Sequence, residues 1–279
     1  MPLLFAPMRM LKTFFVHILL ALTAIGMIFP LLWMLLVSLH ISPESYDSFG
    51  ALLAAPYSLS NYADALQSDD FGRYFINSII VGIIVTTGNV VFCLMTGYAL
   101  ARRSFFGKRI VFASVLGVLM LPQQMLMIPL YRIMTQLGWI DTWYALIIPW
   151  LVTPFGVFLT RQYIMNLPTD IEDAARIDGA GEWRILFRII APLCRPILTV
   201  LAIYTFLMNW NSFLYPFLFT NDAQYRTLPV GLAFYIGKQS IDWGHLMAGA
   251  GISALPVLLL FAIFHKRVIE GLTAGALKE

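Results

Sequence analysis

Six long stretches of this chain contain no Asp, Glu, Lys or Arg, and they limit the available folds more than any other feature. They cover residues 13–43, 74–101, 110–131, 142–160, 196–221 and 243–265. Each supplies about 20 residues, which is enough for an α-helix to cross the roughly 30 Å of hydrocarbon in a bilayer. Backbone amides and carbonyls find no water there, so such segments are expected to span the bilayer as helices. The sequence therefore predicts an all-α membrane protein.

The composition supports the same conclusion. Hydrophobic residues make up 59% of the 279 residues and charged residues only 12%, against roughly 45–50% and 25% in soluble domains. We expect a single transmembrane domain over residues 1–279, with both termini on one side because the number of spans is even. The six predicted spans cover about residues 13–39, 74–101, 110–131, 142–161, 196–220 and 243–265.

Prolines interrupt two of the predicted spans. Because proline cannot donate a backbone hydrogen bond inside a helix, Pro149 and Pro154 predict that the fourth span kinks or starts late. Pro122, among several methionines, predicts a kink in the third. In the second span, Asn77 and Asn89 are expected to join packed helices by hydrogen bonds.

The segments that connect the spans differ in basic residues. Cytoplasmic connections carry the excess of Lys and Arg, so the side that holds 14 of the 18 is predicted to be cytoplasmic. Both termini and residues 168–192 lie on that side, and residues 42–73 form an acidic outer loop. No basic stripe or stacking module supports a nucleic-acid partner. The 14 basic residues are Arg9, Lys12, Arg102, Arg103, Lys108, Arg109, Arg161, Arg176, Arg184, Arg188, Arg195, Lys266, Arg267 and Lys278.

The predicted spans lack the groups that power transport or catalysis. A charged side chain at membrane depth costs at least about 2.5–3.5 kcal/mol and usually marks a proton or ion pathway; here only His17, His245 and His265 can titrate. HExxH motifs, paired carboxylates and a GxxxxGK[ST] phosphate loop are missing, so we expect no catalytic residue, metal or bound cofactor. Cys93 and Cys194 are expected to be inert buried thiols. An ATP-independent channel or facilitator is one alternative that this pattern permits.

A polar segment, residues 168–192, separates the fourth and fifth spans. Thr169 and Glu172 have the spacing of a capping box, and a short helix from about Asp170 to Asp178 is predicted to end at Gly179. Apolar residues then recur at helical spacing as far as Pro192. We expect a helix-turn-helix at the cytoplasmic membrane surface; as a plain amphipathic element it would set Arg184 and Arg188 against anionic membrane lipid.

The spacing within this segment is that of a known motif. Asp173, Ala174 and Ala175 are followed after three residues by Gly179, then after nine by Ile189 and finally by Pro192. This resembles the EAA loop of bacterial ABC importer permeases, E-A-A-x3-G-x9-I-x-L-P. Asp173 replaces the usual Glu of that loop, and Ala191 replaces the usual Leu.

Four further segments resemble the carbohydrate-importer branch of these permeases, in particular the maltose-type second permease subunit. They are Tyr57–Tyr62, Asn209–Leu214, Thr227–Leu232 and Gly271–Gly275. The resemblance implies the six-helix type I permease fold in the bacterial inner membrane. It also implies a second homologous permease, two ABC ATPase subunits that hold ATP and Mg, and a periplasmic or lipid-anchored solute-binding protein. The implied cargo is a sugar or sugar-like solute, with glycerol phosphate or a related polyol or phosphodiester as the alternative.

The resemblance also assigns residue roles. It makes residues 168–192 the coupling loop, in which Asp173 pairs with a basic residue of the ATPase, and residues 42–73 a periplasmic docking surface for the binding protein, where the other interpretation is a solvated lid. The implied coupling residues are Glu172, Asp173, Ala174, Ala175, Asp178, Gly179 and Pro192.

The fifth span contains an unusual group of amide and aromatic side chains. Polar groups at membrane depth need a partner or a water-filled cavity. Amides beside aromatic rings suit sugar recognition, but they also suit interhelical packing. The candidate solute-pathway residues are Tyr204, Asn209, Trp210, Asn211 and Tyr215.

Overall fold

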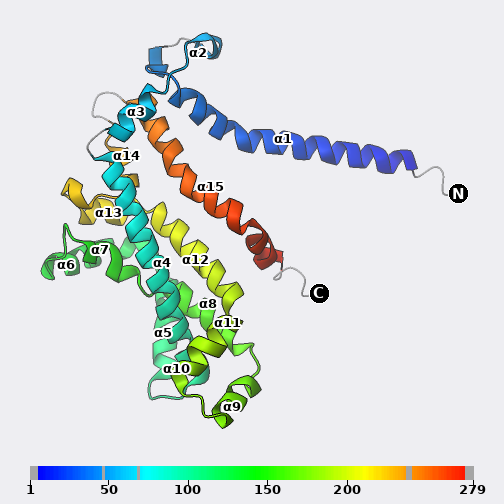
Figure 1. The fold of residues 1–279 in the computed structure, drawn as a ribbon, viewed down its shortest axis with the longest axis vertical. Helices are drawn as coiled ribbons and strands as arrows, with labels where there is room; N and C mark the ends of the chain where they lie inside the picture. Colours follow the sequence, from blue (N-terminus) through cyan, green and yellow to red (C-terminus); the bar gives the residue numbers. More distant parts are fainter. Residues whose placement is uncertain (1–5, 46–47, 68–69, 237–240, 274–279) are drawn as a thin grey trace. The chain divides into compact units, whose positions relative to one another are not determined.

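The computed structural model describes residues 6–45, 48–67, 70–236 and 241–273, and these residues are mostly helical (Figure 1). Within these ranges an isolated bridge between Ile236 and Ile241 is the only extended pairing. The elements are α1 (Ala6–Ser38), η1 (Pro43–Ser45), α2 (Phe49–Ala54), α3 (Ser60–Gln67), α4 (Phe71–Arg102), α5 (Lys108–Leu119), η2 (Gln123–Leu126), α6 (Met127–Gln136), α7 (Trp143–Ile147), η3 (Ile148–Trp150), α8 (Pro154–Met165), α9 (Asp170–Ile177), α10 (Glu182–Ile185), the π-helix η4 (Leu186–Ile190), α11 (Ala191–Leu193), α12 (Arg195–Trp210), α13 (Leu214–Phe219), η5 (Ala223–Tyr225), α14 (Leu228–Ala233) and α15 (Trp243–Thr273).

Four segments are long and apolar enough to cross a membrane as single spans. They are Thr13–Ser38, Phe71–Arg102, Trp143–Met165 and Trp243–Phe264. The third of these is interrupted between η3 and α8, where Pro149 and Pro154 predict a kink or a late start.

The third predicted span is a bent pair of helices, and the fifth begins at a sharp bend after the second half of the polar segment. Lys108–Leu119 and Gln123–Gln136 meet at 107°, and Glu182–Leu193 and Arg195–Trp210 meet at 80°. Pro122 lies in the first break, where it cannot continue the backbone hydrogen-bond ladder. The bend is much sharper than the predicted kink, and the described residues hold four to six candidate spans according to whether each pair counts as one.

The chain divides into two compact units, one of residues 1–69 and 232–255 and the other of residues 70–231 and 256–279. In the first unit a buried amide holds α3 in place. The side-chain nitrogen of Asn61, which is 1% exposed, donates to the carbonyls of Ser38 (2.9 Å) and His40 (2.7 Å). The predicted outer loop therefore contains short helices tied to the chain just beyond α1.

In the second unit, α4 packs along α8 and α12. Asn89 joins all three helices: its amide donates to the carbonyl of Trp150 (2.9 Å) and the hydroxyl of Thr153 (3.2 Å), and it accepts from the hydroxyl of Thr205 (3.2 Å). Asn77 likewise donates to the carbonyls of Gln224 and Arg226. The predicted interhelical role of Asn89 is confirmed, whereas Asn77 joins α4 to the short η5 turn and not to another long helix.

Small residues allow α4 and α8 to approach closely. A Cβ on Gly97 would lie 2.2 Å from the Thr160 hydroxyl oxygen and 2.9 Å from the Arg161 backbone nitrogen. The Thr160 hydroxyl donates across the contact to the Cys93 carbonyl at 2.8 Å. The two helices are therefore fixed to one another along their length.

We predict that Gly97→Ala destabilises the protein by about 1–3 kcal/mol, because overpacking at a tight contact forces the helices apart. Thermal unfolding of the purified protein in detergent measures this. Gly117→Ala on α5 is the matched control, since nothing lies within 4 Å of the added methyl group. Equal melting temperatures for the two variants would contradict the close helix contact.

Candidate coupling loop and solute cavity

The polar segment folds into the predicted helix-turn-helix. Its first helix, α9, covers Asp170–Ile177, and Gly179 follows in the left-handed conformation with φ of +78°. Glycine adopts that conformation without a steric penalty. The second half runs through α10, the π-helix and α11 before the bend into α12. The predicted helix end at Gly179 is confirmed.

The predicted coupling residues lie on two different faces of this loop. Glu172 and Ala175 face inward and are 2% and 8% exposed. Ala175 packs with Ile164 and Ile185 in an apolar cluster beneath the loop. The outer side carries the remaining residues of the turn and of the α9 surface, namely Asp173, Ala174, Asp178 and Gly179, while Pro192 is half-buried.

The predicted capping box is wrong. In the described first turn of α9, Thr169 makes no side-chain hydrogen bond to a backbone amide. The Glu172 carboxylate turns instead toward α4, where it accepts from Nε of Arg102 at 2.6 Å and from the Tyr98 hydroxyl at 3.2 Å. A hydrogen bond from a charged guanidinium is stronger than one from a neutral amide, so the tertiary partner displaces the local one.

Apolar side chains are exposed on the outer face of the loop. Ile177 is 87% exposed and Trp183 is 65% exposed, and the Trp183 ring stacks on Phe187 with centroids 5.9 Å apart. Arg184 and Arg188 are exposed beside Trp183 and Phe187 on the second half of the loop. Exposed apolar groups with a polar rim mark an interaction surface, so this face suits a protein partner as well as a lipid one.

Burial also accounts for the state of Cys194, which lies at the bend between α11 and α12. It is 1% exposed, and desolvation raises the pKa of its thiol to about 11 despite the opposing effect of Arg102. The thiolate form is therefore scarce at neutral pH.

A cavity of about 590 Å³ lies among α4, α5, η2, α6, α8 and α12 of the second unit. This volume is typical of small-molecule sites, which combine an apolar lining with a few polar groups. The described lining residues include no Asp, Glu, Lys, Arg or His. The polar and tyrosine residues among them are Gln123, Thr153, Tyr204, Thr205, Asn209, Ser212 and Tyr215.

Three of the five predicted pathway residues line this cavity: Tyr204, Asn209 and Tyr215. Trp210 lies elsewhere; it is 3% exposed, and its ring packs on Phe206 and Phe75. The Trp210 ring therefore serves in packing between helices rather than in lining the cavity.

Asn211 also lies outside the described lining. It is exposed, and its amide donates to the Leu207 carbonyl of the preceding turn at 2.8 Å. Sequence reasoning missed Gln123, Thr153 and Ser212, which come from three separate breaks between helices. The neighbouring prolines, Pro122 and Pro154, are the sequence signals that could have identified Gln123 and Thr153.

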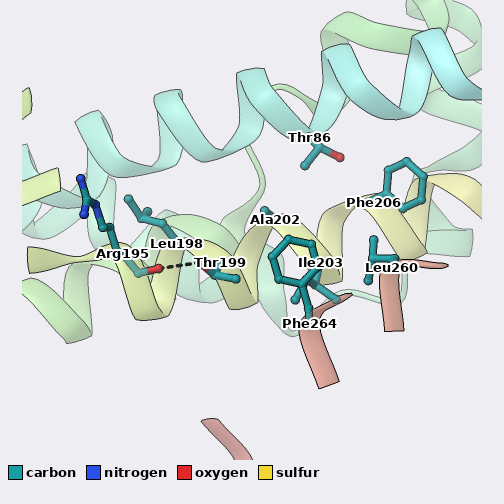
Figure 2. A pocket seen from close by; sticks show the side chains of 9 residues that line it. All are labelled: Thr86, Arg195, Leu198, Thr199, Ala202, Ile203, Phe206, Leu260 and Phe264. Carbon is teal, nitrogen blue, oxygen red and sulfur yellow. Dashed lines mark hydrogen bonds between the residues drawn. The ribbon is translucent and has the colours of Figure 1, made fainter. Parts of the chain in front are cut away.

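A second cavity of about 360 Å³ in the same unit is more apolar (Figure 2). Figure 2 shows Arg195 at one end of it and Phe206 and Leu260 at the other. The Thr199 hydroxyl donates to the Arg195 carbonyl at 2.8 Å rather than to the cavity. Among the described lining residues few polar groups converge, so the larger cavity is the better candidate for a solute.

Comparison with known proteins agrees with this arrangement. Residues 90–273 match the family model described as "Binding-protein-dependent transport system inner membrane component". The chain is 35% identical over 254 residues to the arabinooligosaccharides transport system permease protein AraQ of Bacillus subtilis, with 90% of each chain covered. It is 37% identical over 262 residues to the trehalose/maltose transport system permease protein MalG of Thermococcus litoralis, with 92% of this chain and 94% of the relative covered.

The fold is also found in a solved structure. A chain of a bacterial ABC transporter involved in the import of the acidic polysaccharide alginate superposes with a TM-score of 0.82 at 20% identity, covering 92% of this chain and 96% of that one. The chain therefore belongs to the family of binding-protein-dependent transport system inner membrane components. It is a multi-pass permease subunit of an ABC importer, a transporter component and not an enzyme. The predicted family is confirmed.

Proposed function

We propose that this chain forms one half of the translocation pathway for a neutral sugar or sugar-like solute. The observation that carries the proposal is the uncharged cavity of about 590 Å³, in which Asn209 and hydroxyl groups lie beside aromatic rings. Amide and hydroxyl groups can exchange hydrogen bonds with sugar hydroxyls, and aromatic faces can pack against sugar rings. The relatives that transport arabinooligosaccharides and trehalose or maltose support a carbohydrate cargo.

The partners follow from the family. A second homologous permease would complete the pathway, two ABC ATPase subunits would hold ATP and Mg, and a solute-binding protein would deliver the solute at the periplasmic face. In this arrangement the chain crosses the membrane six times with both termini in the cytoplasm. Residues 42–73 then face the periplasm and residues 168–192 face the ATPase. The family description, which names dependence on a binding protein, supports this assignment.

Transport would proceed by alternating access. Closure of the ATPase dimer would move the exposed face of α9, and the cavity would open to one side of the membrane and then the other. Asp173 is the candidate for a pair with a basic ATPase residue. Its carboxylate is 64% exposed and accepts from Arg176 at 2.7 Å, so a partner guanidinium could share or replace that contact.

An anionic cargo such as glycerol phosphate is the alternative. The likeness to the alginate importer shows that this fold also serves an importer of charged solutes. A phosphate normally binds cationic side chains, and the described lining residues of this cavity provide none. The neutral cargo is therefore the better fit to this chain.

We predict that Asn209→Ala lowers solute-stimulated ATP hydrolysis roughly two- to tenfold at limiting solute in the reconstituted importer, since one lost hydrogen bond is worth about 0.5–1.5 kcal/mol. Asn211→Ala is the matched control, because Asn211 bonds only within its own helix turn among the described contacts. Equal effects of the two substitutions would contradict the assignment of the cavity as the pathway.

We predict that Gly179→Val uncouples transport from ATP hydrolysis. Valine in the left-handed conformation costs about 1–2 kcal/mol, so the turn after α9 would rearrange. Gly181→Val is the control, because Gly181 has an ordinary extended backbone with φ of −72°. Solute transported per ATP should fall in the first variant alone. Normal coupling in Gly179→Val would contradict a role for this turn at the ATPase.

A further inference from the structure

A buried carboxylate holds α9 to the end of α4. The Glu172 side chain is 2% exposed and Arg102, its partner at 2.6 Å, is 11% exposed. A buried charge without a partner is strongly unfavourable, so Glu172 and Arg102 depend on one another. Arg102 is the last residue of α4, which makes this contact a direct bond between a predicted membrane span and the helix that faces the ATPase.

Two side chains of α4, Arg102 and Tyr98, bind the loop at several points. A second guanidinium nitrogen of Arg102 donates to the carbonyl of Leu167 at 2.6 Å, just before α9 begins. One turn earlier on α4, Tyr98 donates to both Glu172 (3.2 Å) and Glu182 (3.3 Å). Glu182 is the first residue of α10, so both halves of the helix-turn-helix contact the end of α4.

Further ion pairs close the network. Arg103 pairs with Glu182, and Arg176 pairs with Glu172 at 3.3 Å. Of the eight described residues of α9, only Glu172 and Ala175 are buried. A single alanine methyl group buries little apolar area. The attachment of α9 to its own unit is therefore mainly ionic rather than hydrophobic.

The middle of α4 reaches the cavity. Val85 on α4 lines the cavity and lies about 25 Å from Arg102 along the helix at about 1.5 Å per residue. Between these points Asn89 and Gly97 fix α4 to α8. A displacement of α9 would thus be passed to a stiff helix that forms part of the cavity wall.

We propose that Glu172, with Arg102 and Tyr98, is the positioning link that transmits motion of α9 to α4 and so to the solute cavity. The proposal rests on the proposed function in one respect, namely that α9 faces the ATPase. Glu172 then acts within the permease and not at the ATPase surface. Its role differs from that of the exposed Asp173 next to it.

The test is the ratio of solute transported to ATP hydrolysed in the reconstituted importer. Glu172→Gln keeps the shape of the side chain but removes the charge, and we expect the ratio to fall about tenfold, within the usual range of coupling effects. Asp170→Asn is the matched control, since it removes an exposed charge from the same helix. The proposal would be overturned if Glu172→Gln transported as much solute per ATP as the unmodified importer.

A double-mutant cycle separates a link from two independent defects. Because Glu172 and Arg102 act as one pair, Glu172→Gln combined with Arg102→Gln should lower the ratio no more than the worse single substitution. Effects that multiply would overturn the proposal. If Gly179→Val leaves coupling normal, the assignment of α9 to the ATPase has failed; if Gly179→Val uncouples and Glu172→Gln does not, only the link has failed.

A distance measurement tests the link without a transport assay. Spin labels at Asp170→Cys on α9 and Ser104→Cys after α4 use two exposed positions outside the implied coupling residues, while the native cysteines are buried. With the link intact, the interlabel distance should stay narrow and unchanged between the nucleotide-free and ATP-bound importer. The conservative Glu172→Asp, which shortens the reach, should broaden it. A broad distance in the unmodified pair, or no broadening in Glu172→Asp, would overturn the proposal.

Discussion

The buried carboxylate of Glu172 is the constraint on which the arrangement of α9 and α4 depends. A carboxylate removed from water is stable only with a charged, hydrogen-bonded partner, and Arg102 supplies it at 2.6 Å. The requirement fixes where α9 can lie, because Arg102 ends α4 and also binds the carbonyl of Leu167. An ionic attachment of this kind holds one orientation, whereas an apolar contact of similar size would tolerate sliding.

The uncharged part of α4 is held by a different kind of contact. There α4 carries no charge between Arg73 and Arg102 and is held by small residues and amides, with Gly97 against Thr160 and Asn89 bridging to α8. Close packing makes the helix stiff. The cavity beside it is formed where helices break, at Gln123, Thr153 and Ser212. Stiff helices joined by bent segments form a structure that can change the shape of a cavity while each helix stays intact.

Local patterns in the sequence predicted the local features of the structure. Charge-free stretches predicted the long helices, and the polar segment from about Asp170 to the terminating Gly179 predicted α9 and its left-handed end. The features that failed or were missed depend on distant residues. Glu172 bonds to a residue 70 positions away, so its spacing from Thr169 wrongly predicted a local capping box. The third span bends, and the fifth begins at a bend, because the backbone breaks there, and composition does not encode the angle of such a break. For the same reason the cavity lining could be identified only in part.

Alternating access at the cavity is the central claim, and its most direct measurement is the accessibility of one cavity residue from the two sides of the membrane. Ser212 lines the cavity and is partly exposed. In the reconstituted importer carrying Ser212→Cys, a membrane-impermeant thiol reagent should label the cysteine from the periplasmic side with ATP bound and from the cytoplasmic side without nucleotide. Labelling that is the same from each side in both states would contradict the account.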